Sequence, residues 1–530
     1  MFPTHFLSNR KSAACIVILF FQLAVVSVTN AQPIFERHNY EVYPFLSRMA
    51  QKGLIVWDDN IQPVLRPQIL AALDTLSAHS TQLTNVEKAE LHFYKKQYDD
   101  KYGKLPLGYA SDQFTLKGLP VIGGSVVTTP DGMILRRSIG ARAWGQISKR
   151  WGYQLSFQDI TETGDRVDTS KKSLLAGPET GAVPQGFFTV NEFNYGEFRG
   201  QVTYSFNKGS VSLAHDYLMW GYGQGGRLVL SDKAPTYPQI RFDFAPLPWL
   251  RFNYVHAWLK SDIPDSARSY TIPNGLYGGV REVFVPKFMA SHSIDLRIMK
   301  GLNFSFGESI IYTDNLNIAY LIPVMFFKAF DNYAGSRSIT RGNNGQFFFQ
   351  LSSRNQLRNT HLYANLLIDE IKISEVFNPE QQRNQLGYTL GASVTDVGVS
   401  YLTIGAEYTK VRPFVYRNFL PAQNYTSASY LLGDWIGMNA DRIFLFARYT
   451  PIPRLKLTAS YMRVRKGADG TLDQQYFQQP QPAFLFGQTA DFNELSFQGS
   501  YELWPRLYLH GGIRAVDGQQ RISAGMHFGL

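Results

Sequence analysis

Cysteine is nearly absent from this chain of 530 residues, which contains Cys15 alone. Cys15 lies in an N-terminal segment that we expect to be removed, so the mature chain would have no disulfide framework and no thiol chemistry. A lipid anchor at Cys15 is excluded as well. A lipidated cysteine should follow the apolar run of its signal, whereas here the apolar residues 16–21 come after it.

Long apolar runs are also missing. After residue 31 no stretch approaches the roughly 20 apolar residues that a membrane-spanning helix needs. No run of five or more basic residues suggests a nucleic-acid partner, and no HExxH, paired-cysteine or clustered His/carboxylate pattern is present. The histidines and serines have no spacing that selects a catalytic triad. These absences predict a protein that is not an enzyme and that binds no metal, cofactor or nucleic acid.

Aromatic residues, in contrast, are abundant. They make up 14% of the chain, with 38 Phe and 30 Tyr, while the mean hydropathy is only −0.19. Membrane β-strands have this combination, because each strand alternates a lipid-facing apolar residue with a polar residue that faces the lumen. The net charge of +10 is scattered along the chain. Attraction of an anionic ligand and simple colloidal charge explain it equally well.

The N-terminus is typical of a secretory signal. Arg10 and Lys11 form a basic region, residues 13–26 form an apolar core, and Thr29-Asn30-Ala31 resembles a small-residue cleavage site. A spanning anchor is the alternative, but the apolar run is short for one. We therefore predict a signal peptide over residues 1–31, cleaved after Ala31, ahead of two further regions at 32–106 and 107–530.

Residues 32–106 are expected to be a small helical segment on the periplasmic side. Pro67 is placed to open one helix, and Thr84-Asn85-Val86-Glu87 has the pattern of a capping box ahead of another. An earlier helix is predicted over residues 42–49. A plug or brace for the following region is the simple role for this segment, and docking of a partner is the other.

From residue 107 onward, short alternating strands are joined in turn by a tight turn and a long polar loop. This rhythm predicts an all-β transmembrane barrel of about 18 antiparallel strands, with tight turns facing the periplasm and long loops facing outside. An even number of strands returns the C-terminus to the side of the N-terminus. The expected strands are 114–127, 132–147, 151–161, 195–206, 210–220, 237–245, 249–260, 282–299, 301–313, 345–353, 358–370, 387–395, 397–410, 440–450, 454–465, 491–502, 506–516 and 519–530.

Tryptophan placement agrees with a barrel in a membrane. Trp151, Trp249 and Trp504 each stand at a predicted tight turn, where an interfacial aromatic girdle is expected. The last strand, 519–530, alternates apolar with small or polar residues and resembles the C-terminal strand of outer-membrane barrels. Localisation in the outer membrane, in contact with its lipid, follows from both observations.

One loop has a glycine-rich pattern that invites a nucleotide-binding interpretation. Residues 221–226 satisfy G-x-G-x-x-G, but a strand follows Pro235 where the dinucleotide fold needs a helix. The residue types fit a saccharide better, because sugar rings stack on aromatics and hydrogen-bond to planar polar groups. We predict Trp220, Tyr222 and Arg227 as ligand contacts. A second aromatic and Arg-rich stretch lies at 411–440, and packing of loops against each other is the alternative for both sets.

Resemblance to a known family becomes specific over residues 216–242 and continues in order through the chain. The chain is similar to the Wzi capsule-assembly family, and departs from it in extended loops at 162–195, 314–344 and 411–440. The residues that carry the likeness are Asp216-Tyr217, Trp220-Gly221-x-Gly223, Gly226-x-Leu228-x-Leu230-Ser231, Ala234-Pro235-x-x-Pro238, Gly307-Glu308, Tyr320-Leu321-Ile322-Pro323 and Leu362-Tyr363-Ala364-Asn365-Leu366-Leu367-Ile368-Asp369.

This resemblance implies an 18-stranded outer-membrane barrel with a periplasmic helical element. It also implies a lectin-like role, in which a monomer attaches or organises capsular or other surface polysaccharide. The competing prediction is a sugar-specific or general porin, since barrels of this size also form channels. The two differ in the lumen: a lumen blocked by a loop or by the helical segment favours attachment, and an open pore favours transport.

Overall fold

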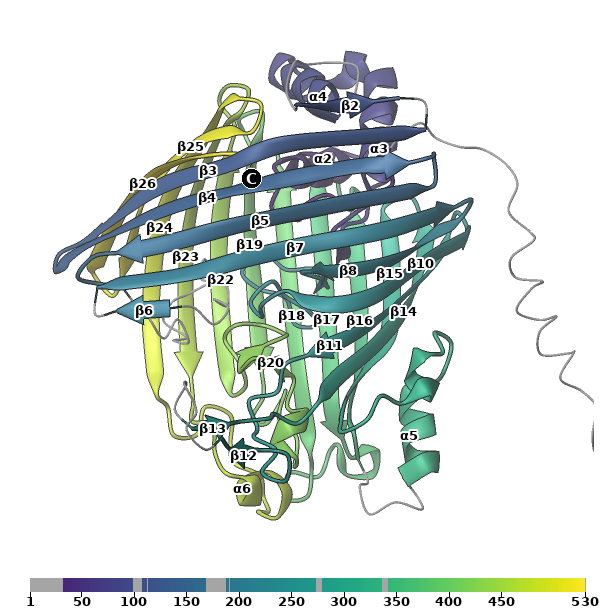
Figure 1. Cartoon of the computed structure of the whole chain (residues 1–530), viewed down its shortest axis with the longest axis vertical. Helices are drawn as coiled ribbons and strands as arrows, with labels where there is room; N and C mark the ends of the chain where they lie inside the picture. The colour runs from purple at the N-terminus through teal and green to yellow at the C-terminus, as the bar shows by residue number, and fades with distance from the viewer. Residues whose placement is uncertain are drawn as a thin grey trace, which may run out of the picture.

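The computed structural model describes residues 32–98, 107–111, 113–167, 187–189, 191–272, 279–335 and 342–529. Within these residues, 18 antiparallel strands close into a barrel (Figure 1). The ring closes where β26 pairs with β3, with Ile522 opposite Thr128. The predicted fold class is confirmed. The predicted signal peptide with its cleavage after Ala31, residues 99–106 and the terminal Leu530 lie outside the described residues.

Each of the 18 predicted strands overlaps one strand of the ring. In chain order these are β3 (Phe114–Thr129), β4 (Gly132–Ile147), β5 (Trp151–Thr163), β7 (Glu192–Phe206), β8 (Gly209–Asp216), β10 (Tyr237–Leu247), β11 (Leu250–Leu259), β14 (Lys287–Met299), β15 (Leu302–Thr313), β16 (Asn344–Arg354), β17 (Thr360–Ile371), β18 (Asn384–Thr395), β19 (Leu402–Val411), β22 (Ala440–Tyr449), β23 (Leu455–Lys466), β24 (Ala490–Trp504), β25 (Leu507–Val516) and β26 (Gln519–Phe528).

Short strands extend or accompany this ring. β2 (Leu107–Ala110) pairs with β3, and β6 (Phe187–Thr189) pairs with β7. Three small antiparallel pairs lie apart from the ring: β1 (Ile61–Gln62) with β9 (Met219–Trp220), β12 (Tyr270–Thr271) with β13 (Val280–Arg281), and β20 (Thr426–Ser427) with β21 (Tyr430–Leu431).

The two ends of the barrel differ as predicted, with tight turns at one end and most of the long loops at the other. Two hairpins at the long-loop end are short, because β3–β4 and β25–β26 are joined by two residues each. Trp151, Trp249 and Trp504 lie at the tight-turn end with 46%, 51% and 66% of their surface exposed. Exposed indoles at one level of the wall match an interfacial girdle.

The predicted strand 210–220 is wrong over its last four residues. β8 ends at Asp216, and the chain then leaves the wall. Met219 and Trp220 form β9, which pairs with β1 of the N-terminal segment. Met219 and Trp220 keep a strand-like pattern because they do form a strand, but its partner is β1 and not a strand of the wall.

Residues 32–98 contain the three predicted helices, α2 (Val42–Gln51), α3 (Arg66–Ala78) and α4 (Asn85–Tyr98). Pro67 stands in the first turn of α3. The capping box before α4 is formed, since the Glu87 amide donates to Thr84 Oγ1 at 3.3 Å and the Thr84 amide donates to Glu87 Oε2 at 2.8 Å. No helix among the described residues is long and apolar enough to cross a membrane.

This N-terminal segment, here called the plug (residues 32–98), occupies the tight-turn end of the barrel (Figure 1). Gln32 donates to Thr115 Oγ1 of β3 at 3.0 Å, and Arg37 donates to Ser156 Oγ of β5 at 2.9 Å. On the opposite side of the ring, Arg48 donates to Thr395 Oγ1 of β18 at 2.9 Å. The plug therefore joins strands from all around the wall.

Apart from η1, the remaining helices among the described residues lie at the other end of the barrel or outside it. They are α5 (Phe327–Gly335) and α6 (Leu472–Tyr476), with the short 3₁₀ turns η1 (Ser80–Gln82), η3 (Ile318–Leu321), η4 (Ile373–Glu375) and η5 (Pro421–Gln423). Only η1 belongs to the plug.

Candidate functional site

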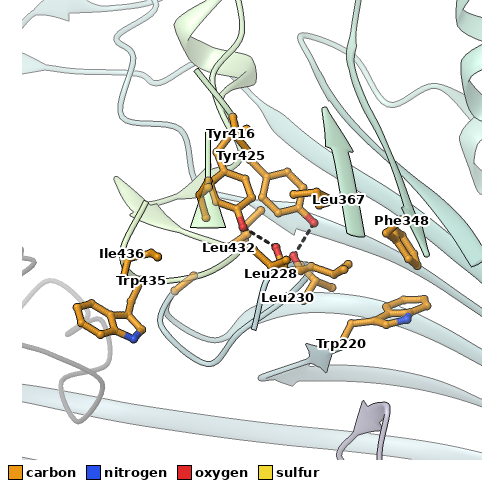
Figure 2. Close-up of a cluster of buried hydrophobic side chains, with 14 of the residues drawn as sticks. Trp220, Leu228, Leu230, Phe348, Leu367, Tyr416, Tyr425, Leu432, Trp435 and Ile436 are labelled. Carbon is orange, nitrogen blue, oxygen red and sulfur yellow. Dashed lines mark hydrogen bonds between the residues drawn. The ribbon is translucent and has the colours of Figure 1, made fainter. Parts of the chain in front are cut away.

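A second insert enters the lumen from the long-loop end. It is the inner loop, residues 217–236, which connects β8 to β10. Trp220 on this loop is 1% exposed, and its ring meets that of Phe348 on β16 edge-to-face at 5.5 Å (Figure 2). Leu228 and Leu230 are buried in the same apolar cluster. The inner loop is therefore packed as a core element and not as a surface loop.

The β19–β22 loop (residues 412–439) covers the inner loop. Tyr416 Oη donates to the Leu228 carbonyl at 2.7 Å and Tyr425 Oη donates to the Val229 carbonyl at 2.9 Å (Figure 2). Trp435 Nε1 donates to the Gly225 carbonyl at 2.8 Å. These three rings are at most 6% exposed. Their hydroxyl and indole donors satisfy inner-loop carbonyls that would otherwise be buried unpaired. Tyr416, Tyr425 and Trp435 therefore pack one loop against the other, which was the alternative for the stretch 411–440.

Arg442 of β22 ties both loops to the wall. Its guanidinium is fully buried and lies 2.8 Å from Asp434 of the β19–β22 loop and 3.2 Å from Glu407 of β19. Glu407 in turn accepts from the backbone amides of Gln224 at 2.7 Å and Gly225 at 3.1 Å. Burying a guanidinium removes its hydration, and the close contacts with two carboxylates offset that cost.

The glycines of residues 221–226 serve this close packing. Gly221 has φ +106°, a conformation that L side chains rarely adopt. A Cβ atom on Gly226 would lie 2.4 Å from Asp434 Oδ2, and one on Gly225 would lie 2.7 Å from Arg442 Nε. Residues 227–236 form no helix. The glycine pattern is explained by packing against carboxylates and an arginine, without a nucleotide.

The three predicted ligand contacts occupy different positions. Trp220 is in the apolar cluster described above. Tyr222 is 4% exposed, and its hydroxyl donates to Asp58 Oδ1 of the plug at 2.8 Å. Arg227 is partly exposed, and its Nη1 donates to the carbonyls of Gly221 at 2.6 Å and Asn60 at 3.3 Å. Their role in ligand binding stays a prediction, and of the three Arg227 lines a cavity.

That cavity has a volume of about 540 Å³ and lies between the plug, the inner loop and the wall from β17 to β23. Cationic and acidic groups both line it, among them Glu41, Arg227, Arg448 and Lys456. Arg448 donates to Gln224 Oε1 at 2.7 Å. Burial raises the pKa of the Glu41 carboxyl, although the nearby Lys456 lowers it. The lining of this polar chamber has more Arg and Lys than Asp and Glu side chains.

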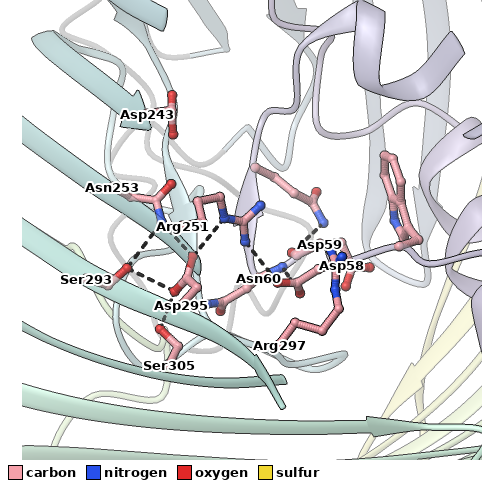
Figure 3. Close-up of polar contacts among 12 residues, drawn as sticks. Asp58, Asp59, Asn60, Asp243, Arg251, Asn253, Ser293, Asp295, Arg297 and Ser305 are labelled. Carbon is pink, nitrogen blue, oxygen red and sulfur yellow. Dashed lines mark hydrogen bonds and ion pairs between the residues drawn. The ribbon is translucent and has the colours of Figure 1, made fainter. Parts of the chain in front are cut away.

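An ion-pair network fixes the plug to the wall on its other side (Figure 3). Arg251 of β11 lies 2.9 Å from Asp58 of the plug and 2.9 Å from Asp295 of β14. Nearby, Arg354 of β16 lies 2.5 Å from Asp59. Burial alone would raise the pKa of Asp59, but the charge and hydrogen bond of Arg354 lower it to about 2.

Aromatic and arginine side chains gather at the long-loop end, in a cluster here called the platform: the exposed Phe419 and Phe477 and the partly buried Arg383 and Tyr476. Phe419 meets Tyr476 edge-to-face at 5.5 Å, and the Arg383 guanidinium lies 5.7 Å from the Tyr476 ring centroid. Phe419 is 52% exposed and Phe477 is 70% exposed. Sequence reasoning missed these residues, although Phe419 falls within the stretch 411–440 that it had selected.

Local capping positions part of the platform. Tyr476 ends α6, which begins with a capping box between Thr471 and Gln474. Arg383 also donates to the Tyr476 carbonyl, and it forms an ion pair with Glu370 at 3.3 Å. Three loops therefore present this surface: β17–β18, β19–β22 and β23–β24. The capping box could have been recognised from the sequence, and the convergence of three loops could not.

Comparison with known proteins identifies the fold of the chain. No family model matches the chain, and no curated protein matches it in sequence. Among solved structures, Wzi of Escherichia coli superposes with a TM-score of 0.60 over 94% of this chain and 100% of that one, at 12% identity. It is described as an outer membrane protein involved in group 1 capsule assembly and a carbohydrate-binding β-barrel.

Two proteins of Pseudomonas aeruginosa also match over much of the chain. OprE gives a TM-score of 0.43 at 10% identity, covering 78% of this chain and 98% of that one. OprD gives a TM-score of 0.41 at 11% identity, covering 80% of this chain and 96% of that one.

Proposed function

We propose that this chain, a Wzi-like outer-membrane barrel, binds polysaccharide with its long-loop end and holds it at the cell surface. The observation that carries the proposal is the double filling of the lumen. The plug occupies the tight-turn end, and the inner loop, covered by the β19–β22 loop, is packed inside as an apolar core. A blocked lumen suits attachment of a ligand better than its passage.

The platform supplies the chemistry for holding a sugar chain. Exposed rings such as Phe419 and Phe477 offer flat apolar faces for the C–H side of a pyranose. Arg383 offers planar donors for hydroxyl or carboxylate oxygens, and a guanidinium binds carboxylates in a bidentate manner.

In this proposal the three residues predicted as ligand contacts support the binding surface indirectly. Trp220 and Tyr222 hold the inner loop and the plug in position, and Arg227 faces the chamber beneath them. We propose a monomeric binding protein without enzymatic activity or cofactor. The carbohydrate binding stated for Wzi of Escherichia coli supports the choice of ligand class.

The test is deletion of the gene followed by measurement of cell-bound and released polysaccharide. We expect the deletion to move polysaccharide from cells to medium, wild-type protein to restore retention, and the double variant Phe419→Ala/Phe477→Ala to restore it poorly at equal outer-membrane abundance. Conductance of purified protein in a planar bilayer is measured alongside and should be small. Normal retention together with a large, steady conductance would establish the transport function instead.

A further inference from the structure

Polar side chains lie on the outer, lipid-facing side of the barrel wall at β11, β14 and β15. Asn253, Ser293 and Ser305 face the lumen, since each hydrogen-bonds to Asp295 in the network next to the plug (Figure 3). Side chains alternate between the two faces of a strand. His292 and Glu308 therefore point outward, into a region where a bare carboxylate would be costly.

A segment of chain covers both groups. This segment, here called the strap (residues 317–333), leaves β15, turns back along the outside of the wall and includes α5. Glu308 is 3% exposed, and its carboxylate accepts from the amides of Phe327 at 2.6 Å and Lys328 at 3.3 Å in the first turn of α5. His292 lies 3.2 Å from Glu308 and 2.9 Å from the Pro323 carbonyl. The carboxylate thus caps the helix and meets its positive dipole end.

The strap also satisfies a polar group of β11. Tyr254 Oη donates to the Tyr320 carbonyl at 2.7 Å, and beside it two residues of the wall pair with each other, His256 with Tyr312 Oη at 2.7 Å. Tyr320 is 1% exposed and its ring lies 4.7 Å from that of Tyr312. The strap is built into the wall by the same kind of contacts that build a core.

Over residues 318–326 the outer face of the strap, by contrast, is apolar and uncovered, and the polar side chains of Lys328 and Asn332 follow on α5. Ile318, Val324 and Phe326 are 74%, 78% and 56% exposed. Phe326 meets Phe347 of β16 at 6.0 Å, so this face runs on into the lipid-facing wall without a polar break. Figure 1 shows α5 outside the barrel, beside the wall.

We propose that the strap is embedded in the outer leaflet of the membrane, with Ile318, Val324 and Phe326 among the acyl chains. Eight residues separate His292 from the tight turn at Lys300, which places it roughly 21 Å above that turn for strands tilted by about 40°. This height falls inside an apolar band about 25 Å tall. Continuity with the lipid-facing wall selects lipid as the occupant over a second copy of the chain.

The test uses single-cysteine variants labelled with a nitroxide and reconstituted in phosphatidylcholine vesicles. Val324→Cys reports the strap, Leu351→Cys the lipid-facing wall, and Phe377→Cys an exposed loop residue, all with Cys15 replaced by serine. Oxygen collides preferentially with labels in lipid, and a water-soluble nickel chelate with labels in water. We expect the Val324→Cys label to match Leu351→Cys, with an oxygen-to-nickel ratio about tenfold above that of Phe377→Cys.

Two results would overturn the proposal. A ratio for Val324→Cys equal to that of Phe377→Cys would place the strap in water. Shielding from both reagents, with disulfide-linked dimers of Val324→Cys, would make a second copy of the chain the occupant. Position 324 is exposed, so the label should leave the fold intact, and heat-modifiable gel migration checks this in each variant.

Discussion

Asp58 and Arg251 join the plug to the barrel wall, with Oδ2 and Nη2 2.9 Å apart (Figure 3). The other oxygen of Asp58 accepts from Tyr222 of the inner loop at 2.8 Å. One carboxylate therefore connects the plug, the wall and the inner loop. Both inserts that fill the lumen depend on this contact, so a change here should show in the permeability of the barrel.

Replacing Arg251 with glutamine should loosen the plug. The change leaves Asp58 and Asp295 without their shared cation, and removing one partner of a largely buried ion pair costs about 3 kcal/mol. We expect brief, large conductance steps in planar bilayers where wild-type protein is quiet. The matched control is Arg463→Gln, because Arg463 forms an exposed pair with Asp491 on the wall. Quiet traces from both variants would show that the pair does not hold the plug.

Acid should release the plug through Asp59. Its pKa in the folded protein, lowered by Arg354 against the effect of burial, is about 2, compared with an ordinary value of 3.8. A lowered pKa means that the carboxylate contributes stability above about pH 4, and that this contribution is lost as the pH falls toward 2. We expect conductance to stay low at pH 5 and to rise between pH 4 and 2.

Asp59→Asn is the control for the acid effect, because it removes the charge at every pH. Its conductance should already be raised at pH 7, and its further rise on acidification should be smaller than in wild-type protein. Equal acid responses in the two proteins would assign the transition to other carboxylates.

Truncating the platform aromatics should weaken polysaccharide binding without affecting the barrel. Phe419→Ala and Phe477→Ala each remove an exposed ring, and loss of one good aromatic contact costs about 1–2 kcal/mol, or roughly five- to thirtyfold in Kd. Isothermal titration with capsular oligosaccharide measures this. Phe377→Ala is the control, since Phe377 is 95% exposed and outside the platform. Equal affinities in all three variants would remove the platform from the binding site.

The architecture was predictable because a barrel strand is specified locally. Each strand alternates apolar and polar residues, so a run such as residues 455–461 reveals its two faces without knowledge of its neighbours. The errors lie at strand ends. The strands predicted over 282–299 and 397–410 begin five residues early, since β14 starts at Lys287 and β19 at Leu402. Beyond Asp216 a strand continues but changes its partner. Pairing is a long-range property, and a periodic pattern does not contain it.

The site was less predictable for a related reason. An aromatic residue in a long loop has the same local sequence whether it faces solvent or another loop. Tyr416 and Phe419 are three residues apart, yet Tyr416 is 3% exposed and donates to an inner-loop carbonyl, and Phe419 is 52% exposed on the platform. Only the arrangement of several loops separates a packing residue from a candidate contact, and the resemblance to Wzi did not supply that arrangement.

A substitution of Trp220 tests whether this residue packs the inner loop or contacts the ligand. Its indole is 1% exposed and packs against Phe348, so Trp220→Ala should lower stability by about 3–5 kcal/mol, the usual cost of a large-to-small core substitution. The temperature at which the folded band is lost on a gel should fall, while Kd for oligosaccharide in the remaining folded protein should be unchanged. Trp249→Ala, which removes a 51% exposed indole at a tight turn, should change neither. Unaltered stability with weaker binding would instead make Trp220 a ligand contact.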